Sequence, residues 1–124
     1  MKKIVIIGAN DFQNQLILKA KEMGFETHVF AWQDGSIGER TADHFYPVSI
    51  VEIDEILEKC REIKPDAVAT IASDLANITV SKVAAGLGLP GNTPECIELS
   101  TNKYAMRSAF LKAGLPTPKF YKVD

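Results

Sequence analysis

The sequence predicts an α/β fold with a mostly parallel sheet and helices on both of its faces, in three layers. Segment 3–8 is a continuous β-branched run ending in glycine, which is typical of a strand buried on both faces of a parallel sheet. Apolar residues then recur at helical spacing over 11–23, and a second strand is expected over 26–32. A strand, a helix and a strand within about thirty residues form a βαβ unit, and alternation of this kind favours a parallel sheet.

The same signals predict the remaining elements. Strands are expected over 44–48, 67–71 and 89–91. Helices are expected over 53–63, over 74–87 and over 102–113, with a further short helix that begins at residue 93. Polar residues and two glycines predict a loop over 33–40, and Pro47 ends its strand or places it at an edge. Asn102 is expected to N-cap the last helix.

Composition and charge exclude several classes of function. With 124 residues, 46% hydrophobic and 24% charged, the chain has the proportions of one soluble globular domain, and we expect neither a signal peptide nor a membrane span. A net charge of −2 gives no electrostatic footprint for nucleic acid. Cys60 is expected in the core, and its separation from Cys96 predicts reduced thiols in a cytoplasmic protein.

The two histidines give no metal signature. His28 lies within an expected strand and His44 beside aromatic residues, and neither has a carboxylate or cysteine at a spacing typical of metal ligands. We interpret both as packing or surface residues and predict no metal site. No catalytic triad or paired-carboxylate pattern is visible, so no catalytic residue is assigned.

Ligands of open parallel sheets bind at the carboxyl ends of the strands, which selects the loops around residues 8–11, 32–35, 72–77 and 91–92. Asn10 and Gln13 occupy the second and third glycine positions of a dinucleotide fingerprint that begins at Gly8, so a nicotinamide or flavin site is disfavoured. Asn10 and Gln13 suit hydrogen bonding to a polar substrate, or a turn and a cap. A second group, Ser73, Asp74 and Asn77, suits a substrate's amine or hydroxyl, although helix capping alone would explain Asp74.

Four segments in a fixed order resemble the N-terminal domain of ATP-grasp enzymes, a family that includes biotin carboxylase, carbamoyl phosphate synthase large subunits, purine-biosynthetic enzymes and amino-acid ligases. These segments are Ile4 to Gly8, Ser73-Asp74, Leu87-Gly88-Leu89-Pro90-Gly91-Asn92, and Asn102-Lys103 with Arg107 and Gly114-Leu115-Pro116-Thr117-Pro118. The resemblance covers nearly the whole chain. It implies a Rossmann-like domain over 1–100, and a helix and connector over 101–124 leading to an ATP-grasp domain.

The resemblance also implies an activity for a longer protein. The enzyme would use ATP and Mg²⁺ to phosphorylate a carboxylate, and a nitrogen nucleophile would displace phosphate from the acyl phosphate. Lys103 is the expected contact with the ATP phosphates, with Arg107 one turn further on, while Asn102 stands where many members have aspartate. Asn10, Gln13, Ser73, Asp74 and Asn77 are the expected substrate residues.

The nucleotide loop and acidic magnesium ligands of the family lie beyond this segment, so we expect a fragment, or one subunit of a split enzyme, that is not catalytic alone. Its partners would be the carboxylate substrate and a C-terminal ATP-grasp domain or subunit, and a second copy of the chain in a homodimer is a further candidate. Two alternatives stay open. One is a non-catalytic nucleotide- or metabolite-binding module, and the other is a structural dimerisation domain.

Overall fold

The computed structural model of the chain describes residues 2–71, 73–91, 96 and 102–114, without the side chains of Lys103, Phe110 and Leu111. Its residues divide into two compact units, 1–91 and 92–124, which we describe separately. The boundary predicted at residue 100 lies outside the described residues and stays a prediction.

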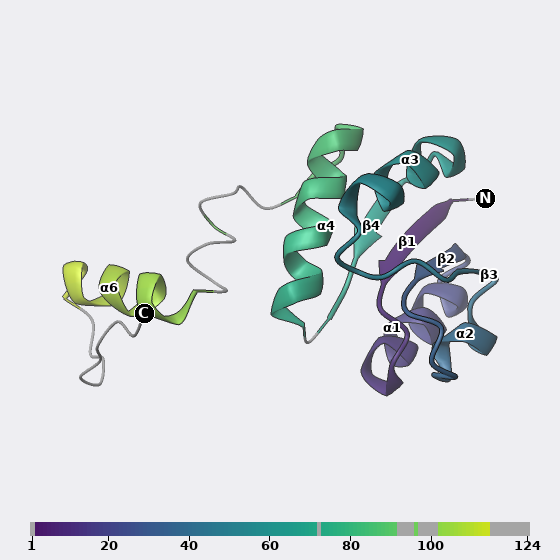
Figure 1. The fold of residues 1–124 in the computed structure, drawn as a ribbon, viewed down its shortest axis with the longest axis horizontal. Helices are drawn as coiled ribbons and strands as arrows, with labels where there is room; N and C mark the ends of the chain where they lie inside the picture. Colours follow the sequence, from purple (N-terminus) through teal and green to yellow (C-terminus); the bar gives the residue numbers. More distant parts are fainter. Residues whose placement is uncertain (1, 72, 92–95, 97–101, 115–124) are drawn as a thin grey trace. The chain divides into compact units, whose positions relative to one another are not determined.

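The first unit is built on a four-stranded parallel sheet (Figure 1). Its strands are β1 (Lys3–Ile7), β2 (Glu26–Phe30), β3 (His44–Tyr46) and β4 (Ala67–Ala69), in the spatial order β3-β2-β1-β4. The β-branched run of β1 lies between two parallel neighbours, which confirms the prediction of a strand inside a parallel sheet. Because the chain adds β2 and β3 on one side of β1 and β4 on the other, the strand order reverses between β1 and β4. Reversals of this kind are where such sheets bind ligands.

Two hydrophobic clusters cover the two faces of the sheet, as alternation along a strand requires. Ile4 and Ile6 of β1 pack with Ile17 of α1 (Asp11–Glu22), on the face that also carries α2 (Gly38–Thr41). Val5 and Ile7 pack with residues of α3 (Ile53–Ile63) and α4 (Asp74–Leu87) on the other face. Cys60 of α3 is fully buried in this second cluster, as predicted. The three-layer fold class is therefore confirmed.

Three local predictions were wrong for identifiable reasons. The segment expected as a loop over 33–40 ends in α2, because the Gly38 N–H donates to the Ala9 carbonyl at 3.0 Å and holds the turn against β1. No strand forms over 89–91, since the Leu89 N–H instead donates to the Ala84 carbonyl at 2.9 Å and completes the C-terminal cap of α4. Met23, expected on the inner face of the first helix, is its C-cap and 64% exposed.

The second unit contains α6 (Lys103–Lys112). Asn102 caps this helix as predicted, because its Oδ1 accepts a hydrogen bond from the Ala105 N–H at 3.1 Å. The helix expected from Thr93-Pro94-Glu95 lies outside the described residues. Within the described residues, no helix is both long and apolar enough to cross a membrane.

Candidate functional site

Two hollows lie at the carboxyl edge of the sheet in the first unit. The first hollow has a volume of about 210 Å³ and is lined by Ala9, Asn10, Ala31, Trp32, Asp34, Ser36, Ser49 and Ile50. The second hollow has a volume of about 250 Å³ and is lined by Thr70, Ile71, Ser73, Asp74 and Asn77. The first follows β1 and β2, and the second follows β4. The two hollows therefore include residues of three of the four selected loops, 8–11, 32–35 and 72–77.

Asn10 and Gln13 have different roles at the end of β1. Asn10 caps α1, because its Oδ1 accepts a hydrogen bond from the Gln13 N–H at 3.0 Å, and it lines the first hollow. The side chain of Gln13 is buried, and its Oε1 accepts from the Ile71 N–H at 3.1 Å while its Nε2 donates to the Ile71 carbonyl. Gln13 thus joins the start of α1 to the chain leaving β4. Its contact with a substrate stays a prediction.

A glycine is required beneath Gln13. Gly8 adopts φ of +107°, a conformation that side chains rarely adopt, and a Cβ atom there would lie 2.9 Å from Gln13 Cγ. Gln13 therefore fills the space that the third glycine of a dinucleotide fingerprint would leave for close backbone approach. This packing agrees with the expectation that the turn does not hold a dinucleotide.

The second hollow is lined by Ser73, Asp74 and Asn77, and their role in binding a substrate stays a prediction. Ser73 is the N-cap of α4, and its hydroxyl accepts a hydrogen bond from the Ala76 N–H at 3.1 Å. The capping role is thus taken by Ser73, so the exposed Asp74 carboxylate in the first turn is not needed for it. Asn77 lies one turn further along α4 and is half-buried. The result is a group of polar side chains beside the β1/β4 reversal.

Asp34 is a lining residue of the first hollow that the sequence reasoning did not select. Its carboxylate accepts hydrogen bonds from the Ser36 hydroxyl and from the Ser36 N–H at 3.0 Å, and these bonds lower the pKa of Asp34. Asp34-Gly35-Ser36 directly follows the second strand, and an aspartate two residues before a bonded N–H is typical of an Asx turn. The Asp-Gly-Ser sequence after the second strand was therefore the signal by which Asp34 could have been selected.

The charge of the two linings limits what they can bind. Each hollow contains one carboxylate, Asp34 or Asp74, and neither lining includes a lysine or arginine among the described residues. Carboxylates, hydroxyls and amide oxygens accept hydrogen bonds and attract cations. The hollows are therefore suited to the ammonium, amine or hydroxyl groups of a ligand.

Lys103 and Arg107 lie in the second unit, on α6. Lys103 is the first residue of the helix, and Arg107 follows one turn later and is half-buried. The two positions are four residues apart, and positions four apart lie on the same face of a helix. Their contact with a nucleotide stays a prediction.

Comparison with known proteins places this arrangement among synthetases and ligases. No protein-family model matches the sequence, and no curated protein matches it significantly. Phosphoribosylglycinamide synthetase from Anaerococcus prevotii matches 94% of this chain with a TM-score of 0.80 and 27% identity. L-amino acid ligase from Bacillus licheniformis matches 95% with a TM-score of 0.80 and 25% identity. N5-carboxyaminoimidazole ribonucleotide synthetase from Thermotoga maritima matches 96% of this chain with a TM-score of 0.76 and 24% identity, and this match shows the fold alone.

These matches confirm the resemblance read from the sequence, since the similar structures are ATP-grasp ligases. The match takes in only 30% of the Anaerococcus chain and 32% of each of the other two. The present chain therefore spans about a third of the length of these enzymes.

Proposed function

We propose that this chain is the substrate-binding part of an ATP-dependent ligase of the ATP-grasp type, which joins a carboxylate to an amine or ammonia through an acyl phosphate. The fold supports this proposal, because nearly the whole chain is matched by ligases and synthetases while about two thirds of each of those enzymes has no counterpart here. The remaining parts would come from a C-terminal ATP-grasp domain or subunit. The complete enzyme would act in the cytoplasm with ATP and Mg²⁺.

The observation that carries the proposal is the second hollow at the β1/β4 reversal. Ser73, Asp74 and Asn77 converge there on one polar space, and the clamp between Gln13 and Ile71 fixes the neighbouring chain. We assign this hollow to the amine or hydroxyl part of the substrate. The name of the Bacillus neighbour, an L-amino acid ligase, supports this choice, because an amino acid carries an ammonium group that Asp74 could bind.

ATP would be bound mainly outside the first unit. Phosphoryl transfer needs cations around the phosphate oxygens, and the two hollows have none in their described linings. Lys103 would supply one such cation, because a lysine in the first turn of a helix is placed against the helix dipole and gains from an anionic ligand. Arg107 would supply a second. Magnesium, when bound by the missing domain, would neutralise the remaining charge.

The first test compares two aspartates in equivalent local positions. Asp74 and Asp54 each lie in the first turn of a helix, so Asp74→Asn and Asp54→Asn should change stability alike. Only Asp74→Asn should weaken binding of amino acids and other amines to the purified chain, by about 10-fold or more, since a hydrogen bond to a charged group is worth about 1.5–3 kcal/mol. Calorimetric titration with a panel of amines provides the measurement. Equal effects of both variants would refute the assignment of the second hollow.

The second test uses the full-length enzyme, after an immunoblot has established whether the native protein exceeds 13.6 kDa. Lys103→Ala should raise the KM for ATP, whereas Lys112→Ala, at the other end of the same helix, should not. An unchanged KM and turnover in Lys103→Ala would reject its role at the phosphates. A metabolite that stabilises the protein without any ATP-dependent activity would favour a non-catalytic binding module. Concentration-dependent association without stabilisation by any small molecule would favour a dimerisation domain.

A further inference from the structure

We propose that Glu26, His28 and His44 form a binding site for a divalent transition-metal ion, with Zn²⁺ as its representative, on the α3 face of the sheet. The site lies at the amino end of β2 and β3, whereas both hollows lie beyond the carboxyl ends of the strands. Two histidines and one carboxylate form a donor set that proteins use for zinc, with a fourth position left for water. The proposal does not depend on the proposed ligase function.

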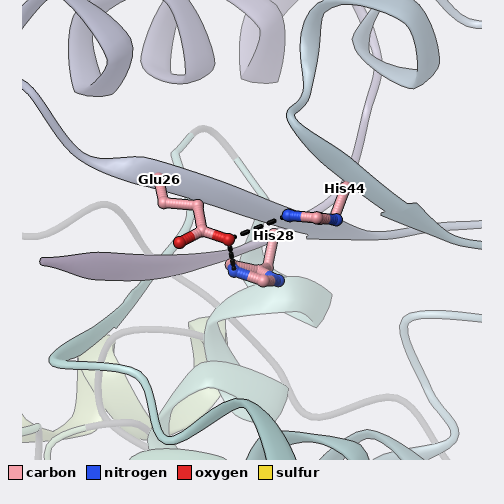
Figure 2. A group of neighbouring side chains, drawn as sticks. All are labelled: Glu26, His28 and His44. Carbon is pink, nitrogen blue, oxygen red and sulfur yellow. Dashed lines mark hydrogen bonds and ion pairs between the residues drawn. The ribbon is translucent and has the colours of Figure 1, made fainter. Parts of the chain in front are cut away.

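The sheet register brings the three side chains together. Glu26 and His28 are two residues apart on β2, so both side chains leave the same face of the strand, and His28 pairs directly with His44 of β3. Figure 2 shows the Glu26 carboxylate beside the two imidazole rings. Ligands on paired strands have fixed Cα positions, which reduces the conformational entropy lost on binding an ion. The interpretation of the two histidines as isolated packing or surface residues missed this shared carboxylate.

The distances are close to those of a metal site. Glu26 Oε1 lies 2.8 Å from His44 Nε2 and 3.1 Å from His28 Nε2, and one ligand atom from each residue lies within 4.8 Å of both others. Tetrahedral zinc with bonds of about 2.0–2.1 Å separates its ligand atoms by roughly 3.3–3.4 Å. Each distance from the carboxylate oxygen to a ring nitrogen is therefore within about half an ångström of the tetrahedral spacing.

His28 supplies the strongest indication of a ligand. Its side chain is 6% exposed, and its Nε2 forms an ion pair with the Glu26 carboxylate at 3.1 Å but has no hydrogen-bond partner that meets geometric criteria within the described part of the chain. A buried polar atom without a hydrogen bond requires an explanation. A metal ion bound through the Nε2 lone pair provides one.

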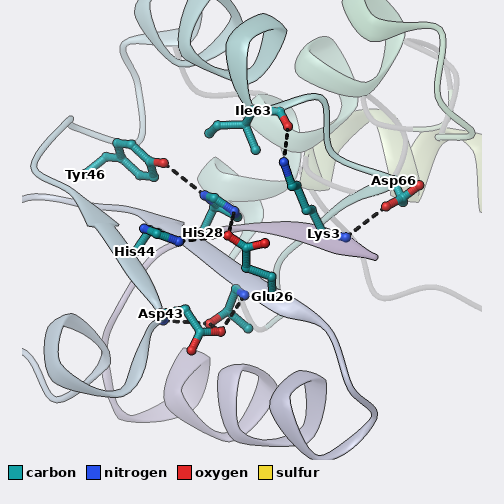
Figure 3. A network of polar contacts seen from close by, with 9 residues as sticks. Lys3, Glu26, His28, Asp43, His44, Tyr46, Ile63 and Asp66 are labelled. Carbon is teal, nitrogen blue, oxygen red and sulfur yellow. Dashed lines mark hydrogen bonds and ion pairs between the residues drawn. The ribbon is translucent and has the colours of Figure 1, made fainter. Parts of the chain in front are cut away.

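The other ring nitrogen of His28 is already held in a way that suits metal binding. His28 Nδ1 lies 2.9 Å from the Tyr46 hydroxyl oxygen, and metal-bound histidines commonly donate their second N–H to an oxygen acceptor (Figure 3). In the tautomer protonated at Nδ1, the Nδ1–H would donate to Tyr46 and the Nε2 lone pair would be available to an ion.

One side chain must turn for the site to close. The rings of His28 and His44 are stacked with centroids 4.6 Å apart and planes 15° apart, whereas a metal lies in the plane of each ring it binds. His44 is 51% exposed, so its ring can rotate while Tyr46 keeps His28 in place. Lys3 is a nearby cation whose charge would repel a bound metal ion. Its ammonium group already has a partner, because it donates to the Ile63 carbonyl at 3.1 Å (Figure 3).

A bound ion would fasten the three-residue edge strand β3 to β2. An ion that binds only the folded chain raises its stability, by RT ln(1 + [ion]/Kd). For a chain of this size, Zn²⁺ at 100 times its Kd should raise Tm by roughly 10 °C. This readout requires no catalytic activity.

The experiment titrates Zn²⁺ and Co²⁺ into the full chain carrying Cys96→Ser, which removes an exposed thiol that could bind either ion. We expect one Zn²⁺ per chain, a visible absorption band from bound Co²⁺, and a rise in Tm. Glu26→Gln and His44→Gln should each weaken binding by about 10-fold or more, because each removes one of three ligands. The control Glu22→Gln removes the same charge from an exposed ion pair with Lys19 and should change nothing.

Nitrogen NMR of the imidazole rings then identifies the ligand atoms. Zn²⁺ should shift Nε2 of both histidines while Nδ1 of His28 stays protonated. Binding that survives both Glu26→Gln and His44→Gln would overturn the proposal. So would a shift confined to His44, or the absence of saturable binding at millimolar Zn²⁺. His28→Asn is informative only if circular dichroism shows a folded chain. The variants of the two partly exposed ligands, Glu26 and His44, decide the test if His28→Asn does not fold.

Discussion

Replacing Gln13 by alanine should destabilise the chain in the absence of any substrate. The substitution removes two hydrogen bonds to the backbone of Ile71, each worth about 1 kcal/mol, and one buried methylene worth about 0.8 kcal/mol. The higher helix propensity of alanine recovers a few tenths of a kcal/mol. The free energy of unfolding should therefore fall by about 2–3 kcal/mol, and Tm by roughly 10 °C.

Urea denaturation followed by circular dichroism measures this loss, and Gln15 provides the matched control. Gln15 lies on the same helix but is exposed, so Gln15→Ala should change the unfolding free energy by less than about 0.5 kcal/mol. Gln13→Met keeps most of the buried volume but neither hydrogen bond, and should lose about 2 kcal/mol. If Gln13→Ala and Gln15→Ala were equally stable, the clamp between α1 and Ile71 would contribute nothing and the reasoning would fail.

Two further predictions concern close packing and thiol chemistry. Gly38→Ala should lower the free energy of unfolding by about 2–3 kcal/mol, because the added Cβ would lie 2.6 Å from the Ala9 carbonyl oxygen. Gly35→Ala should lower it by only about 1 kcal/mol, because Gly35 has φ of +83° but open space around it. The opposite order in urea denaturation would contradict this prediction. Burial raises the pKa of Cys60 from 9.0 to about 11, so its thiolate fraction near neutral pH falls about 100-fold. A chromogenic disulfide should therefore label only the exposed Cys96 quickly in the folded chain, and both cysteines in urea. Rapid labelling of both in the folded state would be inconsistent with a buried Cys60.

The features that sequence reasoning predicted depend on local patterns. The β-branched run of β1 and the helical spacing around Ile17 are readable without knowledge of the fold, and βαβ units then favour a parallel sheet. The capping role of Asn102 follows from residue type next to an apolar periodic segment, whereas residue type alone did not decide between Ser73 and Asp74 as the cap of α4. Ser73, Asp74 and Asn77 line one hollow because they share one helix end, and their contact with a substrate stays a prediction.

The features that it missed depend on residues that are distant in sequence. Gln13 binds the backbone of Ile71, 58 residues away, and nothing near Gln13 in the sequence identifies that partner. Glu26 and His28 are two residues apart on one strand, so their shared face could be predicted from the sequence. His44 joins them only through the register of β2 and β3. Likewise, α2 forms where Gly38 contacts Ala9.

The position of β1 between β2 and β4 has a consequence for the order of folding. Ile4 pairs with Thr27 across one helix, but also with Ala67 after a connection more than twice as long. Closing the longer connection costs roughly 1 kcal/mol more chain entropy, which slows the search for that pairing. We therefore expect β1, α1 and β2 to form the folding nucleus, with β4 docking later. Substitutions in β4 should then accelerate unfolding while leaving the rate of folding nearly unchanged.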